Sequence, residues 1–274
     1  MKHTAGLDMG STYIKAVILS EDRSICGKAM APTGSKLSET SEQVLAQALD
    51  DGDLSREDIK YIITTGYGRH MVPFRDLQVT DLTAAARGAQ MLFPDTRTIL
   101  DIGGQTMKAT RVDEKGQVVT FRLNDKCAAG TGAFLEKTAR YMGYSTSDIG
   151  SLLHLSKQKV PISGVCAVFA ESEVISHLSE GVPPEDIMFG AISSLTDRSV
   201  QLLTRIKAEP SYILIGGILR WDTMARSIVE QLKGLVNVPE GDLPQYVSAL
   251  GAALLGHLRL HQIKKTGTVT ADHT

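Results

Sequence analysis

The stretch "GLDMGSTYIK" (residues 6–15) places an aspartate at the end of an apolar strand and follows it with a turn of glycine, serine and threonine. Backbone N–H groups and hydroxyls in such a turn can bind phosphate oxygens, and Lys15 would add a positive charge. A tight β-hairpin with an Asp-Gly turn is the alternative interpretation. The stretch alone leaves both interpretations open.

A second stretch, "ILDIGGQTMK" (99–108), repeats this arrangement, with Asp101 lying 93 positions after Asp8. Two facing turns of this kind can grip a polyphosphate from both sides, with the two aspartates holding Mg²⁺ through waters. The elements around the two turns repeat as well, because each begins a run of three apolar strands that is followed by helices. We therefore predict an α/β fold of two similar lobes that face an ATP cleft.

Two later stretches extend the pattern. "SYILIGGILRW" (211–221) is an apolar strand that runs into Gly216 and Gly217, and paired glycines let the backbone approach a bulky ligand such as adenosine. "YVSALGAALLG" (246–256) predicts a helix of small residues suited to close packing at a hinge. The four elements in this order resemble the actin, sugar-kinase and Hsp70 ATPase superfamily, which has an actin-like (ribonuclease H-like) fold. The pattern of P-loop enzymes, G-x-x-x-x-G-K-[ST], is absent.

The expected domain organisation follows from these elements. Lobe I is expected at residues 1–96, with a C-terminal helix at 246–262 packing back on it, lobe II at 97–245, and a polar tail at 263–274. Helices are expected at 40–52, at 81–94 with Asp81 as N-cap, and near 131–142, 166–180, 184–206 and 222–234.

Composition and charge exclude several classes of protein. The net charge of −2 comes without a basic cluster, which argues against nucleic-acid or anionic-membrane partners. No apolar run of about 18 residues predicts a membrane span. The N-terminus lacks the apolar run of a signal peptide. Three widely spaced cysteines argue against a disulfide framework, so we expect a cytoplasmic protein.

Two of the cysteines precede predicted helices: Cys127 in "NDKCAAGTGAFLE" (124–136) and Cys166 in "VCAVFAESEVIS" (165–176). A helix N-terminus stabilises a thiolate. Two cysteines do not complete a four-thiolate cluster, but two chains about a two-fold axis would supply four. Isolated cysteines are also common as small buried residues, so both interpretations stand. Glu171 and Glu173, two residues apart on a helix, predict a salt-bridged face rather than a metal site.

Together with "GLDMGST" and "LDIGGQ", the two cysteine stretches resemble the ATP-dependent activator family of 2-hydroxyacyl-CoA dehydratases. This family includes the ATP-binding subunits of benzoyl-CoA reductases (BadF/BadG/BcrA/BcrD-type ATPases) and reductases of double-cubane cluster proteins. The resemblance runs over residues 4–260.

The resemblance implies an oxygen-sensitive, ATP-hydrolysing electron-transfer activator of anaerobic metabolism. It implies a homodimer with one [4Fe–4S] cluster shared between the subunits, held by Cys127 and Cys166 of each chain. A ferredoxin or flavodoxin would supply the electron, and an iron–sulfur acyl-CoA dehydratase or reductase would accept it.

The resemblance also assigns residue roles. Asp8 and Asp101 would hold Mg²⁺ through waters, and Gln105 would position the water that attacks the terminal phosphate of ATP. Gly130 and Gly132 would either bind phosphate or permit a tight helix entry. The other nucleotide-binding positions implied are Gly10, Ser11, Thr12 and Lys15 in the first loop, Gly103 and Gly104 in the second, Gly216 and Gly217 beside the adenosine, and Gln245 before the last helix.

Two other functions remain open at this point. A small-molecule kinase of the same superfamily fits the four nucleotide elements but leaves Cys127 and Cys166 unexplained. A non-enzymatic ATP-binding sensor would bind nucleotide without redox turnover. The acceptor enzyme and the role of the glycine loop at 64–70 are also left undecided.

Overall fold

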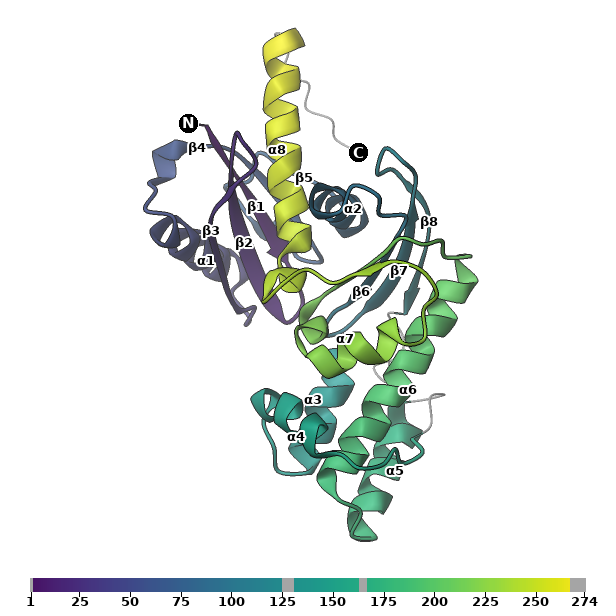
Figure 1. Ribbon diagram of the computed structural model, residues 1–274. Coiled ribbons are helices and arrows are strands. Elements are labelled where there is room, and N and C mark those ends of the chain that lie inside the picture. The colour runs from purple at the N-terminus through teal and green to yellow at the C-terminus, as the bar shows by residue number, and fades with distance from the viewer. Residues whose placement is uncertain (1, 125–130, 163–166, 267–274) are drawn as a thin grey trace. The chain divides into compact units, whose positions relative to one another are not determined.

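The strands of this computed structural model form two five-stranded sheets whose connections follow the same plan (Figure 1). The structure describes residues 2–124, 131–162 and 167–266. The first sheet has the order β3-β2-β1-β4-β5 and the second the order β8-β7-β6-β9-β10. In each sheet three strands form an antiparallel meander, and two more strands run parallel to the first strand of the meander.

The first compact unit comprises the chain up to Pro94 and the described residues from Tyr246 onward. Its elements are β1 (His3–Met9), β2 (Tyr13–Ser20), β3 (Ile25–Pro32), α1 (Leu37–Asp51), β4 (Ile59–Thr65), β5 (Leu77–Gln78), α2 (Asp81–Leu92) and α8 (Val247–Thr266), with 3₁₀ turns at Arg56–Asp58 and Arg69–Met71.

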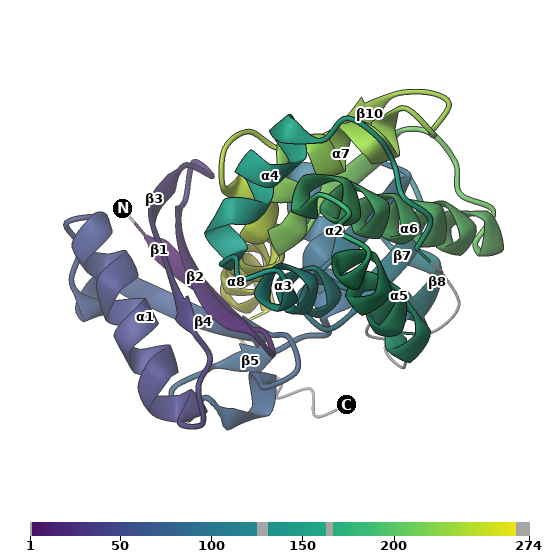
Figure 2. The same ribbon diagram turned by 90° about the horizontal axis from the view of Figure 1, so that it is seen from below.

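Helices cover both faces of the first sheet (Figure 2), which explains why β1 is buried along nearly its whole length. α1 packs on one face and α8 on the other, and α2 packs against α8. The contact between α8 and α2 is a backbone approach, because a Cβ placed on Gly251 would lie only 1.8 Å from the carbonyl oxygen of Ala84. The small residues predicted at 246–256 therefore let two helix backbones touch.

The second compact unit runs from Asp95 to Gln245. Its strands are β6 (Thr98–Ile102), β7 (Met107–Val112), β8 (Val118–Asn124), β9 (Tyr212–Ile215) and β10 (Val236–Asn237). Its helices are α3 (Gly132–Tyr141), α4 (Ile149–Leu155), α5 (Ala167–Ser179), α6 (Pro184–Arg205) and α7 (Asp222–Val229), with 3₁₀ turns at Thr146–Asp148, Gly217–Arg220 and Leu243–Gln245.

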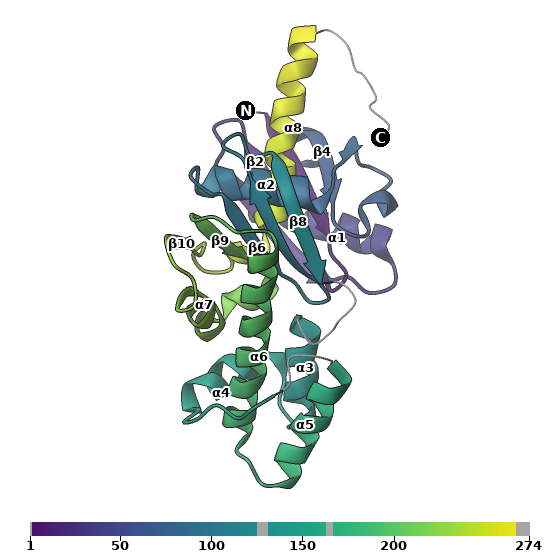
Figure 3. The same ribbon diagram turned by 90° about the vertical axis from the view of Figure 1, so that its right-hand side faces the viewer.

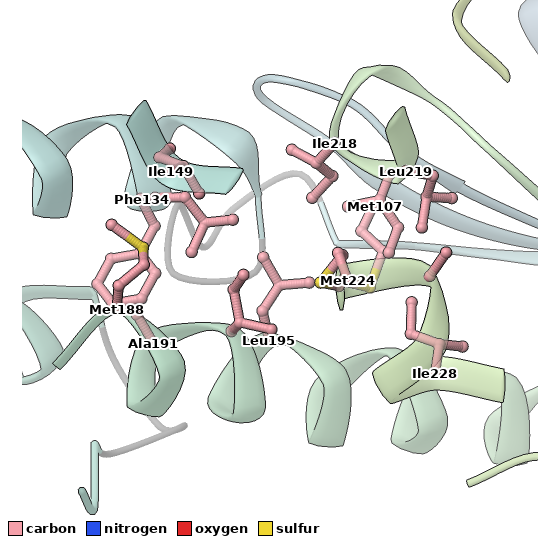
Figure 4. Packing of buried hydrophobic residues seen from close by; sticks show 14 of the residues in the cluster. Met107, Phe134, Ile149, Met188, Ala191, Leu195, Ile218, Leu219, Met224 and Ile228 are labelled. Carbon is pink, nitrogen blue, oxygen red and sulfur yellow. The ribbon is translucent and has the colours of Figure 1, made fainter. Parts of the chain in front are cut away.

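The long helix α6 organises this second unit (Figure 3). It packs against β7 and β8 and also against α3, α4, α5 and α7. A single apolar core follows α6, so that Phe134 of α3 and Leu214 of β9 belong to the same buried cluster. Figure 4 shows Met188, Ala191 and Leu195 of α6 lining this core.

The α/β fold with two similar sheets is confirmed, but several predicted element boundaries are wrong. Asp81 is the first helical residue of α2 and not its N-cap, because Thr80 is extended and its hydroxyl accepts the backbone N–H of Thr83 at 3.2 Å. α7 ends at Val229 rather than near 234, and α8 continues to Thr266 rather than ending near 262. Neither α4 nor the short edge strands β5 and β10 were predicted, although a capping box of Ser145 and Asp148 precedes α4.

The N-terminal turn of α6 holds the segment that leads toward Cys166. The buried carboxylate of Asp186 accepts the backbone N–H groups of Lys157 and Gln158 at 2.8 and 3.0 Å, and the hydroxyl of Ser156 at 3.2 Å. These hydrogen bonds, the two backbone ones first, lower the pKa of Asp186 below its ordinary value.

We expect Gly251→Ala to destabilise the fold, because the added methyl group would overlap the backbone of α2. Overpacking of this kind costs about 1–3 kcal/mol, which exceeds the gain from replacing a helical glycine by alanine. The matched control is Gly150→Ala in α4, where a Cβ would meet nothing closer than 3.7 Å. Urea unfolding should show Gly251→Ala less stable and Gly150→Ala at least as stable as the wild type.

We expect Asp186→Asn to lower the melting temperature at pH 7 and to have a smaller effect in acid. A carboxylate with a depressed folded-state pKa stabilises the fold above its unfolded pKa of about 3.9, and that stabilisation is lost as the pH falls through the folded value. Calorimetry between pH 7 and 3 should show the two melting curves converging. Glu185→Gln, in the same helical turn, is the control; an equal loss in that variant would contradict a specific role for Asp186.

Candidate nucleotide-binding site

Asp8 faces Lys15 across the first hairpin. The two residues pair in register between β1 and β2, and Lys15 Nζ lies 3.0 Å from Asp8 Oδ2. Both side chains are largely buried, with 17% and 13% of their surfaces exposed. Lys15 is therefore placed beside the loop at 10–13, as the sequence predicts, but it is already paired with a carboxylate.

Asp101 faces Lys108 across the second hairpin in the same way. These residues pair in register between β6 and β7, with Lys108 Nζ 3.3 Å from Asp101 Oδ2 and each side chain 16% exposed. In each unit the two strands of the hairpin are joined by a four-residue loop, 10–13 or 103–106, which follows the last pair of facing residues. Lys108 was not among the predicted site residues, although its spacing from Asp101 equals that of Lys15 from Asp8.

In each unit a glycine with a positive φ lies close to the aspartate side chain. Gly66 follows β4 with a φ of 86°, and Gly216 follows β9 with a φ of 106°. A Cβ on Gly66 would lie 2.6 Å from Asp8 Oδ1, and one on Gly216 would lie 2.8 Å from Asp101 Oδ1. The loop at 64–70 is thus the first unit's counterpart of the predicted adenosine loop.

Thr33 fixes the predicted first phosphate loop. Its hydroxyl donates to the carbonyl of Gly10 at 2.7 Å, and its backbone N–H donates to the carbonyl of Thr12 at 3.0 Å. The loop then presents Ser11 as its exposed residue. Thr33 was also missed, because a threonine just after β3 carries no sequence signal that links it to residues 10–12.

The second phosphate loop is bonded to the start of α3. The N–H groups of Gly132 and Ala133 donate to the carbonyls of Gly103 and Gly104 at 3.0 and 2.8 Å. A Cβ on Gly132 would lie 3.3 Å from the Cα of Gly104, so this position permits a tight helix entry, one of the two predicted alternatives. Gln105 is exposed at the tip of the loop.

The predicted adenosine loop lies next to Gln245. The N–H of Gly216 donates to the carbonyl of Pro244 at 2.9 Å, and a Cβ on Gly217 would lie 3.7 Å from Gln245 Oε1. The structure therefore places Gln245, a separate prediction, beside the predicted glycine pair Gly216 and Gly217. Ile218 and Leu219 beyond them are buried in the core of the second unit.

Cys127, Cys166 and Gly130 lie outside the described residues, whereas the helices that follow them are described. Lys137 of α3 and Glu171 of α5 form an ion pair of 2.6 Å, and the hydroxyl of Tyr141 donates to the same carboxylate at 3.3 Å. This pairing raises the pKa of Lys137. The predicted salt bridge of Glu171 is confirmed, and it ties α3 to α5.

Within residues 2–124, 131–162 and 167–266, no three or more His, Cys, Asp or Glu side chains are grouped so as to hold a metal ion. The helices in these ranges include none long and apolar enough to cross a membrane.

Known proteins match this chain over nearly its whole length. The model of the BadF/BadG/BcrA/BcrD ATPase family matches residues 5–256. A 2-hydroxyisocaproyl-CoA dehydratase activator from Clostridioides difficile is 41% identical over 252 residues, which cover 92% of this chain and 94% of the relative. An activator of lactoyl-CoA dehydratase from Anaerotignum propionicum is 39% identical over 255 residues, covering 93% of this chain and 97% of the relative.

Solved structures show the same similarity to dehydratase activators. The activator of the 2-hydroxyisocaproyl-CoA dehydratase from Clostridium difficile, with bound ADPNP, superposes with a TM-score of 0.89 at 39% identity, covering 98% of this chain and all of that one. The chain thus has the actin-like ATPase fold expected from its repeated hairpins. With matching motifs, matching fold and this level of identity, the chain belongs to the BadF/BadG/BcrA/BcrD ATPase family.

Proposed function

We propose that this protein is an ATP-hydrolysing activator that delivers a low-potential electron to an iron–sulfur acyl-CoA dehydratase. The observation that carries the proposal is the 41% identity, over 92% of the chain, to an activator of such a dehydratase. A related activator was solved with the ATP analogue ADPNP, which supports ATP as the nucleotide of this chain.

MgATP binds through the two glycine loops. Ser11, Thr12 and Lys15, which follow Gly10, contact phosphate oxygens from the first loop, and Gly103 and Gly104 contact them from the second. Asp8 and Asp101 orient the waters of Mg²⁺, and Gln105 orients the water that attacks the terminal phosphate. Gly216, Gly217 and Gln245 flank the adenosine, and their mutual contacts support this assignment.

Cys127 and Cys166 of two chains would hold one [4Fe–4S] cluster in a homodimer, because such a cluster takes four thiolates. The cluster, when bound, accepts and donates the single electron. The ion pair between Lys137 and Glu171 supports this proposal, because it ties together α3 and α5, the helices that follow the two cysteines.

A chain of contacts supports coupling between nucleotide and cysteines. The second phosphate loop is bonded to the first residues of α3, and α3 is bonded to α5. A change at Gly103 and Gly104 on phosphate release would therefore move α3, and α5 would follow it. This connection lets the free energy of hydrolysis change the surroundings of the thiolates.

Two alternatives differ from this proposal in what they require. A small-molecule kinase would need a base beside an acceptor hydroxyl and no iron. An ATP-binding sensor would bind nucleotide without electron transfer. The electron acceptor could instead be a benzoyl-CoA reductase or a double-cubane protein, and the mechanism would be as proposed. The electron donor in each case would be a ferredoxin or a flavodoxin.

We expect the anaerobically purified protein to be brown, with about four irons per two chains. Reduced by dithionite, it should activate the 2-hydroxyisocaproyl-CoA dehydratase in the presence of MgATP and fail to do so with MgADPNP. Cys127→Ser and Cys166→Ser should each lose the iron and the transfer, whereas Cys26→Ser, in β3, should keep both. A colourless protein that phosphorylates a sugar would refute the proposal.

We expect Thr33→Val to weaken the binding of MgADPNP by about two- to tenfold. The variant loses one hydrogen bond to Gly10, which is worth about 0.5–1.5 kcal/mol, and leaves the loop less well fixed. Isothermal titration calorimetry measures the effect. Thr204→Val, which removes a hydroxyl bonded to the carbonyl of Val200 within α6, is the control; an equal effect in both variants would count against the loop contact.

A further inference from the structure

Each unit places one lysine at the same point of the same hairpin. Lys15 and Lys108 both stand seven residues after an aspartate and pair with it in register, two strand positions from the four-residue loop. The two ion pairs are alike in length, 3.0 and 3.3 Å, and in exposure. The residues between aspartate and lysine are mostly different, so the repeat preserves the charged pair rather than the loop that it flanks.

Stability alone is a weak explanation for such a pair. Largely buried ion pairs contribute little net stability, because the cost of removing both charges from water offsets their attraction. Asp101 is also the penultimate residue of β6, where it lies against Gly216 and two residues before the second glycine loop. The pair therefore belongs to the nucleotide-binding end of the sheet.

The charges of this pair must rearrange when Mg²⁺ arrives. A Mg²⁺ ion held by Asp101 would compete with Lys108 for the negative charge of the carboxylate. It would also repel the ammonium group of Lys108, which lies about 3 Å from that carboxylate. The side chain of Lys108 is long and rotatable, and phosphate oxygens are the nearest compensating charge that the ligand brings.

We propose that Lys108 is a second phosphate-binding cation, which Asp101 holds while the site has no Mg²⁺ and which moves to a phosphate oxygen when MgATP binds. This inference rests on the proposed nucleotide site and adds Lys108, the last residue of the second glycine stretch, to the residues proposed to bind phosphate. Lys15 would act from the first loop and Lys108 from the second, so each hairpin contributes one aspartate and one lysine.

The test compares Lys108→Met and Lys108→Arg with the wild type in calorimetric titrations with ADPNP, once with Mg²⁺ and once with EDTA. With Mg²⁺ we expect Lys108→Met to bind about tenfold or more weakly, and Lys108→Arg to recover most of the loss. In EDTA the difference between Lys108→Met and the wild type should shrink to about twofold or less, because Asp101 then retains the lysine. A counter-ion with a purely structural role would lower the melting temperature without this dependence on Mg²⁺.

Arg111→Met is the matched control, because Arg111 lies on the same strand and pairs with Glu209 at 2.9 Å, away from the loop. It should bind MgADPNP as the wild type does. Wild-type affinity in Lys108→Met, or an equal loss with Mg²⁺ and with EDTA, would overturn the inference. Failure of the wild type to activate a dehydratase would overturn the proposed electron transfer and leave these binding results standing.

Discussion

Two backbone hydrogen bonds, from the first N–H groups of α3 to the carbonyls of Gly103 and Gly104, are the constraint on which much of the second unit depends. Gly132 makes this approach close, because a Cβ there would lie 3.2 Å from Ile218 Cγ2 and 3.3 Å from the Cα of Gly104. The two hydrogen bonds direct α3 so that Phe134 and Leu135 enter the core along α6. They also join the predicted second phosphate loop to the start of α3, as the proposed coupling of nucleotide and cysteines requires.

The two units share one backbone arrangement but differ in the side chains that it presents. Both contain the hairpin, the Asp–Lys pair, and a glycine with positive φ at the end of the parallel strand beside it. In the first unit, that glycine leads to a loop in which Tyr67 is 87% exposed. In the second unit it leads to buried Ile218 and Leu219, beside Gln245. The backbone plan is therefore shared, whereas the side chains after the glycine decide what each unit presents.

Much of the fold was predictable because its signals are local. An apolar strand that ends in aspartate and glycine is visible in ten residues, and two such stretches implied the repeated sheets. Helical spacing also predicted that Glu171 is salt-bridged, but its partner Lys137 lies on another helix and was not predicted. Where prediction failed, nonlocal or marginal effects decided the outcome. Thr80 displaced Asp81 as the cap because of its extended backbone, and β5 and β10 exist only because a neighbouring strand offers them hydrogen bonds.

The sequence by itself predicted the type of chemistry: two glycine loops with aspartates for a nucleotide, and two cysteines before helices. Both features depend only on residue type and on spacing along the chain. Only the tertiary structure decided that Thr33 fixes the first loop, that Gln245 meets Gly217, and that Lys108 faces Asp101. Register and close packing join residues far apart in the chain, and because such pairings depend on the whole folded core, no short stretch of sequence contains them.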